Sequence, residues 1–144
     1  MPEPGGPSST VVIRRPDPDE LTRRWHEIAP ILSAACERSR CYEPVDVLML
    51  VLAADMLLWI IEINDELVAV VVCKAQQYPR RKVLEMKFAA GTRMREWLSP
   101  ATRHFEALGR ELNCDAISST GRRGWAKACD AAEVDSVCVR DLRD

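Results

Sequence analysis

The segment 121–125 is the densest group of residues in this sequence that could bind another molecule. It places two arginines between two glycines and ends on a tryptophan, in the order Gly-Arg-Arg-Gly-Trp. Arginine and tryptophan carry much of the binding energy at protein interfaces, so Arg122, Arg123 and Trp125 are candidate contacts for an anion or a protein partner. The glycines could equally shape a strand-to-helix turn, with Trp125 packing the next helix against a sheet. Both interpretations stay open.

The cysteines and histidines are too scattered to predict a metal site. The six cysteines are separated by gaps of 5, 32, 41, 15 and 9 residues, and the only histidines are His26 and His104. Zinc sites use closely spaced pairs such as Cys-x-x-Cys, which this sequence lacks. We therefore expect no bound metal and no disulfide, with the cysteines present as reduced thiols. His104 is expected at the surface.

Composition and charge indicate one globular domain. Of the 144 residues, 47% are hydrophobic and 29% are charged, which is enough to bury a core without disulfides. The net charge of −2 does not favour nucleic acid as a partner. The sequence starts without the apolar segment of a signal peptide, and its longest apolar stretch, 45–61, is interrupted by two aspartates. We expect no membrane span and a cytoplasmic location.

The sequence divides into a leader and one domain. Residues 1–15 are rich in Pro, Gly and Ser and are expected to form a flexible leader, although 11–14 has a short extended pattern. A single domain is expected over 16–144. Its first helix is predicted from the sequence Asp-Pro-Asp-Glu at 17–20, which is typical of a helix start. Pro30 is expected to kink or divide this helix.

A run of strands follows a second predicted helix. This helix spans 44–54 and is expected to be largely buried because it has few polar residues. Alternation of side chains then predicts strands over 57–63 and 82–88, and an apolar, β-branched run predicts a strand over 66–74, joined to the first by a tight turn at 64–65. The middle strand is apolar on both faces, so it belongs in the centre of a sheet. Together the three strands predict an antiparallel meander.

Helices and strands alternate in the last part of the chain. A long helix is predicted over 94–113, with Ser99-Pro100 as an alternative start after a short turn. We expect it to pack on the sheet through Leu98, Phe105 and Leu108. Three shorter elements complete the order: a strand at 114–118, a helix at 125–132 and a strand at 134–139.

This order of elements resembles the fold of the GCN5-related N-acetyltransferases (GNAT) over about residues 16–139. Shorter motifs resemble small GNAT-like proteins encoded by tailed bacteriophages. These motifs are Leu58-Trp59, Tyr78-Pro79-Arg80-Arg81, Ala90-Gly91 before Glu96-Trp97, Leu112-Asn113-Cys114-Asp115 and Gly121–Trp125. The resemblance implies an α/β (α+β) fold with a central, mostly antiparallel mixed sheet that is flanked by helices on both faces.

The resemblance also implies a place for acetyl-CoA at the start of the long helix, where backbone N–H groups hold the pyrophosphate. In this chain that place is Gly91, Thr92, Arg93 and Met94. The family's loop reads Gln/Arg-x-x-Gly-x-Gly/Ala, whereas residues 89–94 supply one glycine. The side chains of Arg93 and Met94 are expected to hinder close approach to the backbone. We therefore expect a degenerate site and no bound cofactor.

A general base is implied on the third strand of the meander, and Glu85 is the candidate there. An alternating Glu-x-Lys pair is also typical of the solvent-facing side of a strand, so this role stays open. The tyrosine that relatives often use as a general acid lies on the last short helix of the family. The corresponding segment here offers Trp125, Lys127 and Cys129 instead.

Two functions follow from these observations. The first is a phage-type GNAT-fold protein with a degenerate acyl-CoA site. It would bind a protein partner, such as a phage structural protein or a second copy of itself, in the host cytoplasm or in the virion. The alternative is an acetyl-CoA-dependent N-acetyltransferase that acts on a protein or a small amine, with Glu85 as base and residues 91–94 on the phosphates. The altered loop and the missing acid favour the first.

Overall fold

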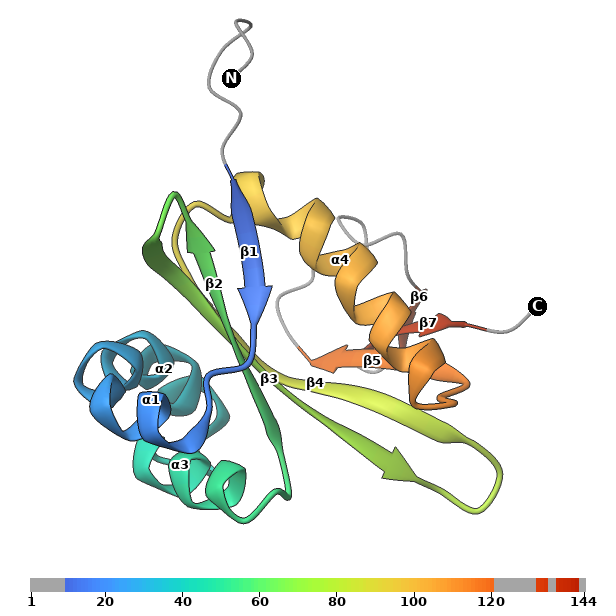
Figure 1. Ribbon diagram of the computed structural model, residues 1–144. Helices are drawn as coiled ribbons and strands as arrows, with labels where there is room; N and C mark the ends of the chain where they lie inside the picture. Colours follow the sequence, from blue (N-terminus) through green and yellow to red (C-terminus); the bar gives the residue numbers. More distant parts are fainter. Residues whose placement is uncertain (1–9, 121–131, 135–136, 143–144) are drawn as a thin grey trace, which may run out of the picture.

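The computed structural model describes residues 10–120, 132–134 and 137–142. In this part of the chain seven strands form one sheet in the order β1-β2-β3-β4-β5-β7-β6 (Figure 1). Neighbouring strands are antiparallel except β4 and β5, which are parallel. The strands are β1 (Val11–Arg14), β2 (Leu57–Ile63), β3 (Glu66–Gln77), β4 (Lys82–Gly91), β5 (Ala116–Thr120), β6 (Ala132–Val134) and β7 (Val137–Asp141). The predicted mixed, mostly antiparallel sheet is confirmed.

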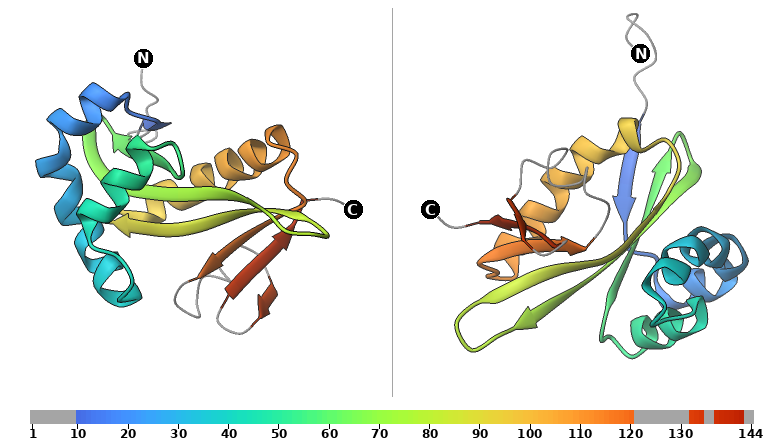
Figure 2. Two further views of the ribbon diagram at one scale, coloured as in Figure 1. Left: turned by 90° about the horizontal axis from the view of Figure 1, so that it is seen from below. Right: turned by 180° about the vertical axis from the view of Figure 1, so that it is seen from behind.

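Helices cover both faces of the sheet, as predicted. The helices are α1 (Pro18–Arg23), α2 (Trp25–Ser39), α3 (Pro44–Leu52) and α4 (Met94–Glu111). The first three form one apolar cluster with Leu58 and Ile60 of β2, whereas α4 forms a second cluster with Trp59 and Ile61. Because alternate residues of a strand point to opposite faces, the two clusters lie on opposite sides of the sheet. Figures 1 and 2 show α1–α3 grouped at one side of the molecule and α4 at the other.

The predicted central strand and its turn are confirmed. Residues 68–73 of β3 are at most 3% exposed, and β3 pairs with both β2 and β4. Asn64 and Asp65 have positive φ angles of 51° and 69°. Two consecutive residues in this region are typical of the tight turns that suit the twist of a two-stranded hairpin.

Ion pairs attach β1 and α1 to the sheet. Arg14 of β1 donates hydrogen bonds to Glu20 of α1 at 2.7 and 2.8 Å and to Glu62 of β2 at 2.9 Å. Arg24 contacts the same two carboxylates at 3.2 and 3.3 Å. The hydrogen bonds from Arg14 lower the pKa of Glu20 to about 2. The domain boundary predicted at residue 16 is therefore too late, because Val11–Arg14 already belongs to the sheet.

The first helical region divides at Arg24 and not near Pro30. Arg24 has φ −99° and ψ 9°, which separates α1 from α2, whereas Pro30 lies inside α2. Proline removes the hydrogen bond to the carbonyl four residues earlier, here that of His26. Both Pro30 and His26 are exposed, so water can solvate this carbonyl, while Ile28 and Leu32 stay buried on the other side. The predicted division at Pro30 is wrong for this reason.

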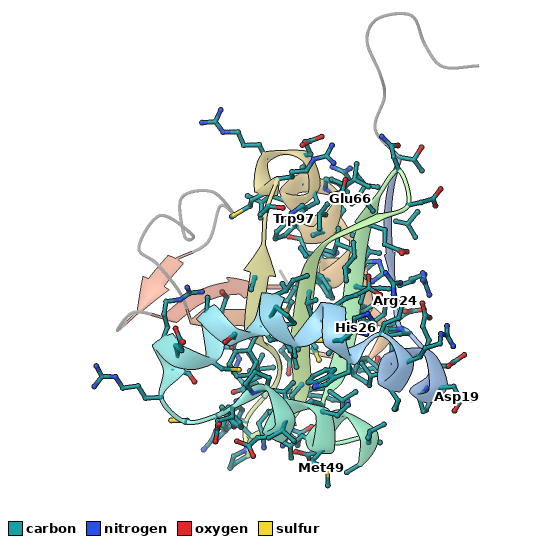
Figure 3. The ribbon with its side chains drawn as sticks, turned by 90° about the vertical axis from the view of Figure 1, so that its left-hand side faces the viewer. Asp19, Arg24, His26, Met49, Glu66 and Trp97 are labelled. Carbon is teal, nitrogen blue, oxygen red and sulfur yellow. The ribbon has the colours of Figure 1, made fainter. Side chains whose placement is uncertain are left out.

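The prediction that the helix at 44–54 is largely buried is wrong. Only Val47 of α3 is buried, and the side of the helix with Val45, Met49 and Leu52 is 54%, 63% and 46% exposed. Figure 3 shows Met49 at the outer surface, pointing away from the sheet. The helix lies at the outside of its layer, so one face reaches the core and the opposite face, although apolar, meets solvent. Its start at Pro44 with a Glu43–Asp46 capping box agrees with the sequence.

The long helix α4 is continuous from Met94, with Pro100 inside it, so no separate start occurs at Ser99. Its buried stripe consists of Trp97, Ala101, Phe105 and Gly109, and Leu108 packs at the margin of the same cluster. The packing predicted for Phe105 and Leu108 is confirmed. Leu98 is half-buried and lies outside both apolar clusters, because the neighbouring Trp97 takes the position facing the sheet.

The end of the chain is described in part. The helix predicted at 125–132 lies outside the described residues, apart from Ala132, which begins β6. The strand predicted at 134–139 is divided, since β6 ends at Val134 and β7 begins at Val137. The strand predicted at 114–118 is β5, which begins two residues later.

Cys36, Cys41, Cys73 and Cys114 are all free thiols. Burial raises the pKa of the Cys73 thiol to about 12, so it is a core residue and not a nucleophile. Within the described ranges, no group of three or more His, Cys, Asp or Glu residues could hold a metal ion. None of the helices described is long and apolar enough to cross a membrane.

Candidate functional site

The parallel pairing of β4 with β5 covers only part of β4. It extends from Val83, opposite Ala116, to Met86, opposite Ser119, while β4 continues to Gly91. In the part of the chain that the structure describes, the outer edge of β4 over 87–91 has no pairing with β5. A strand edge of this kind presents backbone N–H and C=O groups that an extended ligand can bind.

Lys87 forms a β-bulge where this pairing ends. Val72 and Cys73 are consecutive on β3, but their partners on β4 are Phe88 and Met86. Lys87 is therefore the extra residue on β4. A bulge bends its strand and leaves the extra residue out of the ladder of hydrogen bonds. The bulge thus marks the point at which β4 and β5 part.

Gly91 allows β4 to approach β3 closely before the chain enters α4. Its φ is +147°, and a Cβ here would lie 2.2 Å from the carbonyl oxygen of Val68 and 2.5 Å from Cα of Ala69. The N–H of Thr92 then donates to the same Val68 oxygen at 2.9 Å. Strand packing alone requires this glycine. Its presence is therefore not by itself a sign of a phosphate site.

The side chains of Arg93 and Met94 are both engaged elsewhere. Arg93 donates from Nε and Nη2 to the two carboxylate oxygens of Glu96 at 2.7 Å each, and its Nη1 lies 3.7 Å from Oε1 of Glu66. Met94 packs at the margin of the apolar cluster between α4 and the sheet. Because Met94 packs toward the core, its side chain does not obstruct the start of α4 as expected. The guanidinium of Arg93 is held by the carboxylates of Glu96 and Glu66.

Trp97 fixes the loop that leads into α4. Its indole Nε1 donates to the carbonyl of Thr92 at 2.7 Å, and the side chain is only 3% exposed. Figure 3 shows Trp97 and Glu66 at the same end of the molecule. The first N–H groups of a helix lack intrahelical partners and carry the positive end of its dipole. The loop therefore presents these groups directly after the part of β4, residues 87–91, that lies beyond the pairing with β5.

Glu85 belongs to a cluster of polar side chains on β4 and the β3–β4 turn. Its Oε2 accepts a hydrogen bond from the hydroxyl of Tyr78, and its Oε1 lies 3.1 Å from Nζ of Lys87. The hydrogen bond to Glu85 raises the pKa of Tyr78 above its usual range. The Glu85 side chain is 18% exposed, so it is half-buried and not fully solvated. On the neighbouring strands its partners are Lys74 and Ser118.

Sequence reasoning did not predict that Tyr78 and Lys87 contact Glu85. Tyr78 precedes Glu85 by seven residues, and only the turn that its N–H makes with the carbonyl of Arg81, at 2.8 Å, directs it back along β4. Alternation placed Lys87 on the same face as Glu85 but could not reveal the bulge. The three residues form a compact acid–base group at the point where β4 and β5 part.

Several other residues considered from the sequence lie outside the part of the chain that the structure describes. Arg122, Arg123 and Trp125 lie outside the described residues, as do Lys127 and Cys129. His104 is not a surface residue, since its ring packs edge-on against Trp59 with centroids 4.6 Å apart, and burial lowers its pKa. Among the described residues, the candidate site consists of the edge of β4, the start of α4 and the Glu85 cluster.

Comparison with models of known protein families gives no match, and comparison with curated protein sequences gives none either. Several solved structures are similar to the chain. A GNAT family acetyltransferase from Brucella melitensis, in complex with acetyl-CoA, has 12% identity and a TM-score of 0.65, over 94% of this chain and 90% of that one. A GNAT family acetyltransferase from Staphylococcus aureus has 10% identity and a TM-score of 0.69, over 93% of this chain and all of that one (100%).

A third similar structure is the catalytic domain of the Tetrahymena GCN5 histone acetyltransferase in complex with coenzyme A. It has 11% identity and a TM-score of 0.61, over 94% of this chain and 93% of that one. At such low identities the similarity concerns the fold. The fold is that of the GNAT acetyltransferases, as the order of elements predicted.

Proposed function

We propose that this protein is an N-acyltransferase that uses acetyl-CoA as its donor. The observation that carries the proposal is the edge of β4 over 87–91, which leads directly into the first turn of α4. The backbone groups of this edge suit the amide-containing arm of coenzyme A, and the N–H groups at the start of α4 suit its pyrophosphate. The acetyl-CoA and coenzyme A in two of the similar structures support the same function.

The residues present fit such a donor. Gly91 and Thr92 are held against Val68, and Met94 is turned toward the core, so the start of α4 is rigid and lacks a blocking apolar side chain. Arg95 in the first turn is exposed and adds a positive charge for phosphate. When bound, acetyl-CoA supplies an acetyl group activated as a thioester.

Glu85 is the proposed base. Its carboxylate accepts a proton from the attacking amine, directly or through one water, and the hydroxyl of Tyr78 holds it in place. The acceptor is proposed to be an amine of a protein or of a small molecule. The family's tyrosine acid has no counterpart in the sequence, so we propose that the leaving thiolate takes its proton from Glu85 or from water.

The role first favoured by the sequence stays a prediction. It comprises a phage origin, a degenerate acyl-CoA site and a contact with a phage structural protein through Arg122, Arg123 and Trp125. A place in the host cytoplasm or in the virion belongs to the same prediction. The similar structures provide no support for any of these points. They support the acetyltransferase more than a purely structural protein.

Calorimetric titration with acetyl-CoA tests the proposal. We expect saturable binding by the wild-type chain and binding weaker by about tenfold or more for Arg95→Glu, because a carboxylate at a helix start repels the phosphates. Arg103→Glu, which makes the same charge change two turns further along α4, is the matched control and should bind as the wild type does. Absence of binding to the folded wild-type protein, or an equal loss in both variants, would contradict the proposal.

A further inference from the structure

Lys87 places a primary amine beside a carboxylate at the proposed acyl-CoA site. It is the bulged residue of β4 and the first residue beyond the pairing of Met86 with Ser119. Its Nζ lies 3.1 Å from Oε1 of Glu85, and its side chain is 32% exposed. An amine and a base are therefore in contact at the beginning of the edge that would carry the arm of the donor.

We propose that Lys87 is an acceptor of the protein's own acetyl transfer, with Glu85 as the base that deprotonates it. This inference rests on the proposed function, because it takes acetyl-CoA as the donor. It adds a modification site that also alters the catalytic group. In the unmodified protein, Oε1 of Glu85 is engaged by the Lys87 ammonium. Acetylation removes that positive charge and with it the ion pair, which leaves the carboxylate available to an external amine.

The transfer balances with the groups named. Oε1 of Glu85 takes one proton from the Lys87 ammonium, and the resulting amine forms a C–N bond with the carbonyl carbon of the thioester. The C–S bond breaks, and its electron pair leaves with the sulfur of coenzyme A. Glu85 returns its proton to this thiolate, while the second proton lost from the Lys87 nitrogen goes to water. The products are acetyl-lysine and free coenzyme A, with no oxidation or reduction.

The hydrogen bond from Tyr78 gives Glu85 one fixed orientation. It engages Oε2 and so leaves Oε1 facing Lys87. A base that is held against its substrate atom contributes roughly 100-fold to 10,000-fold to a rate. The selectivity for Lys87 over other lysines follows from this contact and from the place of the bulge.

Lys74 is a matched internal control. Its side chain is 29% exposed, close to the 32% of Lys87, and it too forms an ion pair, with Asp55 at 3.3 Å. It lies on β3, where its partner across the sheet is Glu85, and not on the edge of β4 over 87–91. The whole sequence has only four lysines, at positions 74, 82, 87 and 127, so each can be followed separately.

The experiment is to incubate the full chain with acetyl-CoA at neutral pH and to map acetylation of each lysine over time by peptide mass spectrometry. Calorimetry on the same preparation measures the binding of acetyl-CoA. We expect Lys87 to be modified well before Lys74. Glu85→Gln should slow the acetylation of Lys87 by about 100-fold, and Asp55→Asn should leave the rate at Lys87 unchanged. Should Glu85→Gln fail to fold, Glu85→Asp, which keeps a shorter carboxylate, is expected to give an intermediate rate.

The outcomes separate the inference from the proposed function. If acetyl-CoA binds but Lys87 reacts no faster than Lys74, the self-acetylation is refuted while the acyltransferase stands. The same holds if Arg95→Glu weakens binding but leaves the labelling of Lys87 unchanged, because the reaction then occurs from free solution. If acetyl-CoA does not bind at all, both are refuted.

Discussion

Arg93 holds Glu96 in a two-point contact, with Nε and Nη2 each 2.7 Å from a carboxylate oxygen, while its own backbone adopts a φ of 59°. A left-handed conformation is unfavourable for a residue with a Cβ and natural for glycine. The pair therefore keeps a strained residue at the start of α4 and directs its guanidinium along the first turn. In the family's loop, by resemblance, glycine or alanine is found near this position.

Replacing Arg93 by glycine tests what this contact does. We expect Arg93→Gly to raise the midpoint of thermal unfolding, because relief of the backbone strain outweighs the loss of an exposed ion pair. Acetyl-CoA should bind at least as tightly as to the wild type. Arg93→Ala is the control, since it removes the same ion pair but keeps the strain, and it should lower the midpoint. Loss of acetyl-CoA binding in both variants would mean that the side chain itself grips the phosphates.

Gly91 is expected to tolerate no side chain. In Gly91→Ala the new Cβ would meet the backbone of Val68 and Ala69 at 2.2 to 2.5 Å, so the free energy of unfolding should fall by about 3 kcal/mol or more in urea titrations. Gly109→Ala is the control within the same sheet–helix core. Its Cβ would lie 2.6 Å from Cδ1 of Leu142, the end of a flexible side chain, and at ordinary contact distances of 3.7 and 3.8 Å from Ile117 and Leu84. Alanine also favours a helix, so stability should stay within about 1 kcal/mol of the wild type. Similar losses in the two variants would contradict this account of Gly91.

Stability should depend on pH through Glu20. Hydrogen bonds from Arg14 lower its pKa to about 2 from an ordinary value of 4.5. A carboxylate whose pKa is lowered on folding stabilises the protein above its unfolded pKa, and this stabilisation is lost as the pH falls toward the folded value. In urea titrations, the free energy of unfolding of Glu20→Gln should therefore be well below that of the wild type at neutral pH. The difference between the two should close between about pH 4.5 and 2.

The control for this measurement is Glu37→Gln, which removes one exposed carboxylate from α2. The difference in free energy of unfolding between this variant and the wild type should stay constant over the same pH range. A gap between Glu20→Gln and the wild type that stays constant down to pH 2 would show that Glu20 acts by packing and not by charge.

The hydroxyl of Tyr78 should titrate later than a free tyrosine. The sequence has only two tyrosines, so in Tyr42→Phe the ultraviolet absorbance of tyrosinate reports Tyr78 alone. Because the carboxylate of Glu85 accepts a hydrogen bond from the Tyr78 hydroxyl, the pKa of Tyr78 should lie above its usual range, and Glu85→Gln should bring it back down. Identical titrations with and without the Glu85 carboxylate would show that the two residues are not coupled in solution.

Local sequence patterns predicted the strands and the turn whose structure depends mainly on neighbouring residues in the sequence. The alternation in 57–63 and the apolar, β-branched run in 66–74 predicted both strands, because each strand has neighbours on both edges and is covered on both faces. The tight turn followed from Asn64-Asp65. The helix break at Arg24 and the exposed side of α3 could not be predicted. Both depend on which face of a helix meets another element, and a single sequence does not reveal this.

Sequence reasoning named residues of the candidate site but not their arrangement. Glu85 and residues 91–94 were identified, by resemblance, as places for a base and for phosphates. The bulge at Lys87, the reach of Tyr78 and the inward turn of Met94 are consequences of strand register and turn geometry. The apolar side chain of Met94, which was expected to block the start of α4, packs into the core, so one of the arguments for a degenerate site no longer holds.

The most direct test of the central claim is a backbone-amide NMR titration of the full chain with acetyl-CoA. The account predicts that the largest shift changes fall on two segments, the edge of β4 at 87–91 and the first turn of α4 at 93–96, and that they saturate together as one binding event. No saturable change, or changes confined to another surface such as the exposed side of α3 at 45–52, would contradict it.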